Sequence, residues 1–239
     1  MYEDDIRIDT RHGAMHANII KKGRLPIFFI HGLGASMSSW NRLVENFEAD
    51  CSLILIDMIG HGESDAPEID YTVKVQEDAL IDLLSSMNLK PESAVFFGHS
   101  YGGWVSMRIA IDYGAKALIL EDAVGMQSYF DSINYQENNE EVAKEAKILG
   151  ANERVIRSII YNRKEGMVKE EELSRIACPT KIIWGGEDKL ISPEFAKILN
   201  KNIKNSSLSI IDGAGHVPHY THPEEVKEEI YKFIQSIGV

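Results

Sequence analysis

Cysteine and positive charge are both scarce in this sequence of 239 residues. The two cysteines, Cys51 and Cys178, are far apart and lack the spacing of metal ligands. We expect two buried free thiols in a reducing compartment, and therefore a cytoplasmic protein. Only 25 lysines and arginines face 37 acidic residues, which gives a net charge of -12. This deficit argues against nucleic acid and against an anionic membrane surface as partners, because both attract clustered basic side chains.

Long apolar runs and cofactor motifs are missing as well. No stretch approaches the roughly 18 apolar residues of a membrane-spanning helix. The acidic start, residues 1–5, lacks the basic and apolar regions of a signal peptide. We see no cluster of metal ligands, no phosphate-binding loop and no dinucleotide-binding glycine pattern. We therefore expect no metal and no organic cofactor.

The sequence does contain enough apolar residues, 44% of the total, to bury a core. Short, continuously apolar runs alternate with helical patterns, which is typical of parallel strands covered on both faces. We therefore predict an α/β sheet with right-handed crossovers. The predicted strands are residues 14–20, which we expect to be antiparallel, 27–30, 53–56, 94–97, 117–120, 181–184 and 208–211.

Helical patterns fill the segments between these strands. Residues 75–87 place their apolar side chains on one helical face, and a final helix begins near Pro223. Residues 125–176 contain no convincing strand and are rich in charged, helix-favouring residues, notably 140–147, 154–161 and 168–176. We interpret 125–176 as a helical cap insertion in a core made of 1–124 and 177–239. The carboxyl ends of the strands, where open α/β sheets bind ligands, are its expected place.

A serine occupies the centre of residues 98–103, which read Gly-His-Ser-Tyr-Gly-Gly. This run follows a predicted strand and precedes a helical pattern at 104–110. A sharp turn there would expose the hydroxyl of Ser100 above the sheet edge, at a helix N-terminus. That is the placement of a nucleophile, which also needs a base, an orienting acid and an oxyanion hole.

The candidate base is His216, in the glycine-rich loop that follows the last predicted strand. His219 and His222 lie at the start of the final helix, and we interpret both as capping or surface groups. The candidate acid is Asp188, in a turn after the strand 181–184. Two alternatives are Asp122, directly after the strand 117–120, and the weaker candidate Glu187.

The backbone N–H of Tyr101, the residue after the serine, is one candidate oxyanion donor. The second should come from residues 31–36, His-Gly-Leu-Gly-Ala-Ser, where we choose Leu33 ahead of Gly34. The loop 57–64 also holds Asp, His and Ser side chains. We interpret this loop as structural, with polar groups that fix its backbone.

These motifs together resemble the α/β-hydrolase superfamily, in particular its small-cap carboxylesterases and meta-cleavage hydrolases. The resemblance rests on residues 31–34, 57–64, 98–103, 185–188 and 213–216, in that order along the chain. It implies an eight-stranded, mostly parallel sheet with a helical cap after the sixth strand, here about 125–176. Because position 100 is serine, the aspartate-dependent dehalogenases and epoxide hydrolases of this fold are set aside.

We therefore expect a serine hydrolase that cleaves carboxylic esters of small or medium, mainly apolar acyl groups through an acyl-enzyme. Hydrolysis of a C–C bond, a lactone or a thioester on the same triad is the alternative, followed by a non-catalytic ligand-binding protein. The expected partner is a small-molecule ester, and the protein is expected to be a monomer or homodimer. Predicted pocket residues are Met37, Trp104, Val124, Met126, Tyr129, Phe130 and Val217.

Overall fold

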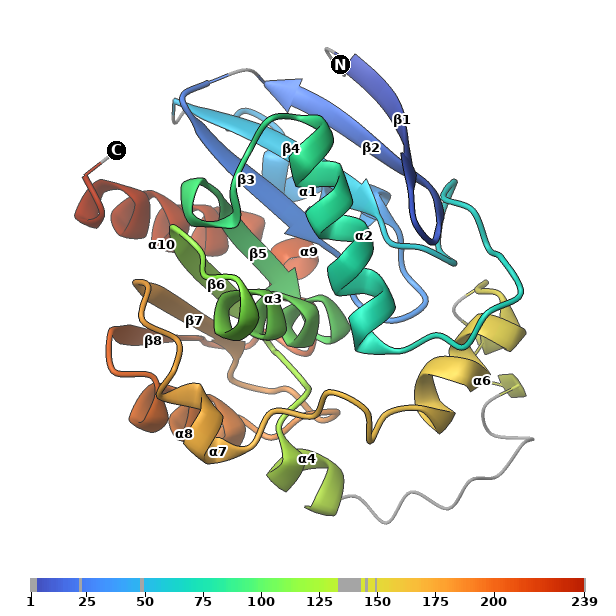
Figure 1. Cartoon of the computed structure of the whole chain (residues 1–239). Helices are drawn as coiled ribbons and strands as arrows, with labels where there is room; N and C mark the ends of the chain where they lie inside the picture. Colours follow the sequence, from blue (N-terminus) through green and yellow to red (C-terminus); the bar gives the residue numbers. More distant parts are fainter. Residues whose placement is uncertain are drawn as a thin grey trace.

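A single twisted sheet forms the centre of the molecule (Figure 1). The computed structural model describes residues 4–21, 23–47, 50–132, 143–144, 146–148 and 150–238. Within them the strands are β1 Asp4–Thr10, β2 Gly13–Lys21, β3 Leu25–Ile30, β4 Cys51–Asp57, β5 Val95–His99, β6 Ala117–Glu121, β7 Thr180–Gly185 and β8 Ser206–Ile211. Their order in the sheet is β1-β2-β4-β3-β5-β6-β7-β8. Strand β2 is antiparallel to both of its neighbours, and all other neighbouring pairs are parallel.

Helices cover both faces of the sheet. They are α1 Asn41–Val44, α2 Val73–Ser86, α3 Tyr101–Asp112, α4 Gln127–Ser132, α6 Glu153–Tyr161, α7 Glu170–Leu173, α8 Glu194–Asn202, α9 Pro218–Thr221 and α10 Pro223–Ser236, with short 3-10 turns at Met37–Trp40 and Pro91–Ser93. Apolar residues of α2, α3, α7 and α8 join one buried cluster. Those of α1 and α10 join a second cluster on the opposite face. In Figure 1, α2 and α3 lie in front of the sheet and α10 lies behind it.

The central strands supply both clusters at once because successive side chains of a strand point to opposite faces. In β3, Phe28 belongs to the first cluster and Phe29 to the second. In β5, Phe96 and Phe97 divide in the same way. Every residue of β3 and of β5 is buried. This two-sided burial is why these segments are continuously apolar in the sequence.

The seven strands predicted from the apolar pattern and their antiparallel start are confirmed, and one further strand completes the eight that the resemblance implies. Strand β1, of sequence DDIRIDT, alternates exposed and half-buried residues along the edge of the sheet. Its two isoleucines are too few to stand out as an apolar run. The predicted helix 75–87 is also confirmed as α2, which begins two residues earlier, after Thr72. The Thr72 hydroxyl accepts the Val75 N–H at 3.3 Å and so caps the helix.

Three described helices, α4, α6 and α7, lie between β6 and β7, where the sequence predicts the cap. An isolated parallel bridge joins Met126 to Val168, and α7 packs against α3 and α8. The predicted helical pattern at 140–147 lies partly outside the described residues, so the division into core and cap stays a prediction. No helix in the described part of the chain is long and apolar enough to cross a membrane.

Neither Cys51 nor Cys178 forms a disulfide bond in the described part of the chain. Cys51 is buried in the second apolar cluster, as expected, whereas Cys178 is only half-buried. Burial nevertheless raises the pKa of the Cys178 thiol to about 11.

Candidate active site

Ser100 alone forms the turn between β5 and α3. Its backbone has φ +51° and ψ -113°, in the left-handed half of conformational space that a serine rarely adopts. The flanking glycines permit this turn. A Cβ at position 98 would lie 2.2 Å from the carbonyl oxygen of Gly102, and one at position 102 would lie 2.1 Å from that of Ile30. The sharp turn expected from the sequence is therefore present, and it requires glycine at these two positions.

A chain of hydrogen bonds joins Ser100, His216 and Asp188. His216 Nε2 lies 3.1 Å from Ser100 Oγ, and His216 Nδ1 lies 2.8 Å from Asp188 Oδ2. The other carboxylate oxygen, Oδ1, accepts the N–H groups of Leu190 and Ile191 at 2.8 and 3.0 Å. Burial alone would raise the pKa of Asp188, but the hydrogen bonds from His216 and Ile191 lower it. An ionised Asp188 holds the proton on Nδ1 and leaves Nε2 free to accept the serine proton.

Asp122, the alternative acid, lies close to this chain but is bonded differently. It is fully buried with φ +44°, and its Oδ1 accepts the Gly185 N–H at 3.0 Å. Burial, followed by the nearby charge of Glu121, raises its pKa to about 10. At neutral pH Asp122 is therefore a neutral acid, which cannot balance a positive imidazolium. The structure pairs His216 with Asp188 instead, and Glu187 is exposed.

The two candidate oxyanion donors belong to the wall of one cavity. Leu33 and Tyr101 both line the cavity that contains Ser100, whereas Gly34 lines a neighbouring polar cavity. Tyr101 is the first residue of α3, where backbone N–H groups have no acceptor within the helix. The loop before Leu33 is fixed by His31, whose Nδ1 lies 2.8 Å from the carbonyl oxygen of Gly32. Burial lowers the pKa of His31 to about 4, so this ring is neutral.

The cavity in front of Ser100 has a volume of about 450 Å³ and a mostly apolar wall. Five of the seven predicted pocket residues line it beside Leu33, namely Trp104, Val124, Tyr129, Phe130 and Val217. Met37 and Met126 are not in this wall. Met37 is buried in the second apolar cluster, and Met126 is buried in the first. Flexible apolar side chains suit a core as well as a pocket, so residue type alone did not separate these roles.

The sequence analysis did not identify the side of this cavity that α6 and the residues after it form. Ile159 and Ile160 come from α6, and Arg163 follows it. The helical spacing of apolar residues in 154–161 could have identified the two isoleucines. Nothing in the sequence singles out Arg163, whose guanidinium donates to the Ile160 carbonyl at 2.8 Å. Leu190 and Ile191, next to Asp188 in the chain, complete the missed part of the wall.

The loop 57–64 makes contacts that match its interpretation as structural. Asp57 accepts the N–H of Met37 at 2.7 Å and that of Glu63 at 2.9 Å. The Ser64 hydroxyl donates to the Asp57 carbonyl at 2.6 Å. Its histidine, His61, is buried, and burial lowers the pKa of the ring to about 3. These polar groups fix the backbone of two neighbouring loops.

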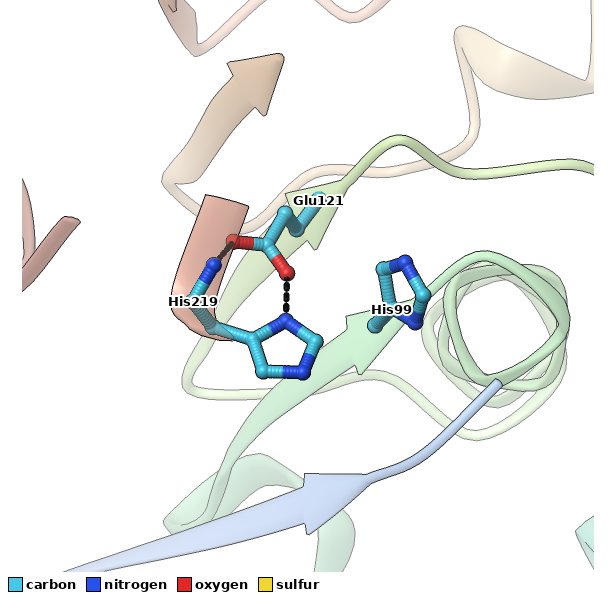
Figure 2. A group of neighbouring side chains, drawn as sticks. All are labelled: His99, Glu121 and His219. Atoms are coloured by element: carbon cyan, nitrogen blue, oxygen red, sulfur yellow. Dashed lines mark hydrogen bonds and ion pairs between the residues drawn. The ribbon is translucent and has the colours of Figure 1, made fainter. Parts of the chain in front are cut away.

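A second buried polar group consists of His99, Glu121 and His219 (Figure 2). It adjoins the Ser100–His216–Asp188 chain, because His99 binds the main chain of His216. His219 is fully buried and bonded to Glu121, which corrects its interpretation as a capping or surface group. His222 is half-buried and contacts the Thr221 hydroxyl at 2.9 Å. The cluster has three metal-ligand side chains, but Glu121 and His219 bind each other, and His99 Nε2 binds the His216 carbonyl. We therefore interpret the three side chains as a structural hydrogen-bonded cluster and not as a metal site.

Comparison with known proteins agrees with this geometry. A model described as "Alpha/beta hydrolase family" matches residues 27–161, more than half of the chain. Lipase 1 of Psychrobacter immobilis is 26% identical over 89% of this chain and 77% of the lipase. The 2-hydroxy-6-oxo-6-(2'-aminophenyl)hexa-2,4-dienoic acid hydrolase of Metapseudomonas resinovorans is 22% identical over 93% of this chain and 88% of that enzyme.

Among solved structures, a thermophilic esterase from Thermogutta terrifontis has a similar fold. The TM-score is 0.80 at 22% identity, over 99% of this chain and 100% of the esterase. The eight-stranded sheet, the serine turn and the family match lead to one assignment. The chain belongs to the alpha/beta hydrolase family, and it is a hydrolase.

Proposed function

We propose that this protein is a serine hydrolase that cleaves carboxylic esters of small or medium, mainly apolar acyl groups. The observation that carries the proposal is the hydrogen-bonded chain from Ser100 through His216 to Asp188, which opens onto an apolar cavity. The same constellation activates serine in unrelated folds, because its chemistry depends on geometry and not on sequence position.

In the proposed reaction, Ser100 Oγ attacks the ester carbonyl carbon while His216 Nε2 takes the hydroxyl proton. The negative charge that develops on the carbonyl oxygen is stabilised by the N–H groups of Leu33 and Tyr101. The C–O bond then breaks, and His216 protonates the leaving alcohol. A water molecule, deprotonated by His216, then attacks the acyl carbon. The bond from that carbon to Ser100 Oγ breaks, His216 returns the proton to Ser100, and the acid is released. Asp188 holds the imidazole in place and balances its charge in both steps.

The shape and lining of the cavity support an apolar acyl group. Trp104, Tyr129 and Phe130 form a packed aromatic wall, with ring centroids 5.2 Å apart in each neighbouring pair. Ile159 and Ile160 of α6 add apolar surface from the cap side. A volume of about 450 Å³ lies within the usual range for small-molecule sites.

One observation favours a second candidate on the same triad. Arg163 lines this otherwise mostly apolar cavity, and a guanidinium there is suited to bind a substrate carboxylate. This favours hydrolysis of a C–C bond in a vinylogous diketone that ends in a carboxylate. A relative from Metapseudomonas resinovorans is named for an acid of this kind.

A substrate panel tests both candidates. p-Nitrophenyl esters from acetate to long acyl chains would be run beside a carboxylated vinylogous diketone and a lactone, with Ser100→Ala as the control. We expect ester turnover highest for short or medium acyl chains and lost in Ser100→Ala, with the fold unchanged by circular dichroism. Turnover of the diketone alone would replace the ester proposal with the second candidate. Ester hydrolysis at the wild-type rate in Ser100→Ala would refute both.

A further inference from the structure

Glu121 contacts both halves of the proposed active site. Its main-chain carbonyl accepts the N–H of Ser100 at 2.9 Å. Its side chain accepts two hydrogen bonds from His219, three residues after His216. We propose that Glu121 is a positioning residue that holds the His216 loop in register with Ser100, a role that rests on the proposed function.

The carboxylate of Glu121 holds the start of α9 at two points. One oxygen, Oε1, accepts the main-chain N–H of His219 at 2.9 Å, and the other, Oε2, accepts its ring Nδ1–H (Figure 2). Both side chains are fully buried, and the Trp40 ring packs against the imidazole with centroids 4.2 Å apart. A shift of α9 would leave a buried carboxylate without its donors, which is strongly unfavourable.

A second contact holds His216 itself. His99, the residue before Ser100, donates from Nε2–H to the main-chain carbonyl of His216 at 2.7 Å. Burial, with the neighbouring His219 and His216, keeps the pKa of His99 well below its usual value, so the ring is neutral. The His216 carbonyl is thus hydrogen-bonded to His99 at the end of β5. The loop that carries His216 is also bonded, through His219, to Glu121 at the end of β6.

Glu121 differs from the two histidines in its access to the substrate. His99 and His219 belong to the cavity wall, whereas Glu121 does not. Glu121 therefore does not contact the substrate directly, and we expect its effect on turnover to pass through the placement of His216. Substrate binding, which uses the apolar wall, should be left nearly intact by a change at Glu121.

Glu121→Gln tests this role. The amide keeps the size of the side chain but turns its own N–H group toward one of the two N–H groups of His219. We expect kcat to fall about 100-fold, as for a misplacement of about 1 Å, with KM changed by less than about two-fold. The matched control is Glu229→Gln, which breaks a largely buried contact with Lys181 and Ser209 away from the cavity. It should lower the melting temperature and leave kcat unchanged.

Variants of His219 supply a conservative rescue. In His219→Asn the side-chain amide places a donor near the position of Nδ1, whereas His219→Leu removes the donor. We expect His219→Asn to be at least about ten-fold more active than His219→Leu. The double variant Glu121→Gln/His219→Leu should lose no more activity than the worse single variant, because both changes break one interaction. If Glu121→Gln does not fold, the comparison of His219→Asn with His219→Leu tests the positioning role instead.

The NMR resonance of the His216 ring N–H bonded to Asp188 reports the same geometry without turnover. We expect it to shift or broaden in Glu121→Gln and to stay in place in Glu229→Gln. If the wild type cleaves esters and Glu121→Gln matches its kcat, the positioning role is wrong and the ester proposal stands. If the wild type cleaves no ester, the ester proposal fails. An unchanged resonance in Glu121→Gln would then overturn the positioning role as well.

Discussion

Replacing Asp122 by asparagine should make the protein more stable at neutral and alkaline pH. Asp122 is fully buried beside the hydrogen-bonded Ser100–His216–Asp188 chain, and its pKa is raised to about 10 by burial and by Glu121. Asparagine keeps the oxygen that accepts the Gly185 N–H, and it tolerates the left-handed backbone at this position at least as well as aspartate. The variant therefore removes the titration, and the interaction of this side chain with Asp188 is the other contact that changes.

The sign and size of the effect follow from proton linkage. Between a pKa of 3.8 unfolded and about 10 folded, the folded protein holds a proton at Asp122 that the unfolded chain has released. Asp122 is thus most favourable to folding below about pH 4. Above that pH its contribution declines by about 1.4 kcal/mol per pH unit. By pH 7 the loss reaches about 4 kcal/mol, and it continues toward pH 10.

Urea unfolding of the wild type and of Asp122→Asn across about pH 5 to pH 9 measures this difference. The difference in unfolding free energy should widen in favour of the variant as the pH rises. Asp9→Asn, a change at an exposed carboxylate on β1, is the control and should run parallel to the wild type. Parallel curves for the wild type and Asp122→Asn would show that Asp122 is ionised in the folded protein, and the reasoning would fail.

Three further predictions concern the site. Asp188→Asn should lower kcat about 10⁴-fold with the fold intact, because the asparagine no longer holds the productive imidazole tautomer; a loss below about ten-fold in a steady-state ester assay would count against Asp188. Gly102→Ala should yield insoluble or inactive protein, since its Cβ would lie 2.1 Å from the Ile30 carbonyl oxygen; a soluble variant with wild-type turnover would contradict this. Arg163→Gln should raise KM for a carboxylated substrate about ten-fold and leave KM for a neutral ester unchanged, in line with a typical charged hydrogen bond; equal effects on both substrates would remove Arg163 from carboxylate binding.

The sheet and the serine turn were predictable because their physical requirements are local. A strand buried on both faces must be continuously apolar, and this pattern identifies β3 and β5 in the sequence. A serine at positive φ between a strand and a helix needs glycines where backbones nearly touch, and glycine is visible in the sequence. The apolar pattern did not reveal the edge strand β1, because only alternate residues of this strand are half-buried and the others are exposed.

The parts that were missed depend on contacts between distant segments. Glu121 and His219 are 98 residues apart, and neither carries a local sign that it binds the other. A charged residue at the end of an apolar run indicates that Glu121 has a buried partner, but it does not indicate that this partner is His219. Arg163 is likewise one of several lysines and arginines between β6 and β7, and such side chains are usually exposed. Its place in the cavity wall follows from how α6 packs.

The sharing of central strands between two apolar clusters has a consequence for how the molecule unfolds. Phe28 and Phe29 are neighbours in β3, yet they stabilise opposite layers of the structure. Removing the helices of one layer would expose half of the side chains on each central strand to water. The other layer would then rest on a sheet that had lost much of its burial. The two layers therefore form one cooperative unit, and the loops at the strand ends that carry Ser100, Asp188 and His216 share its stability.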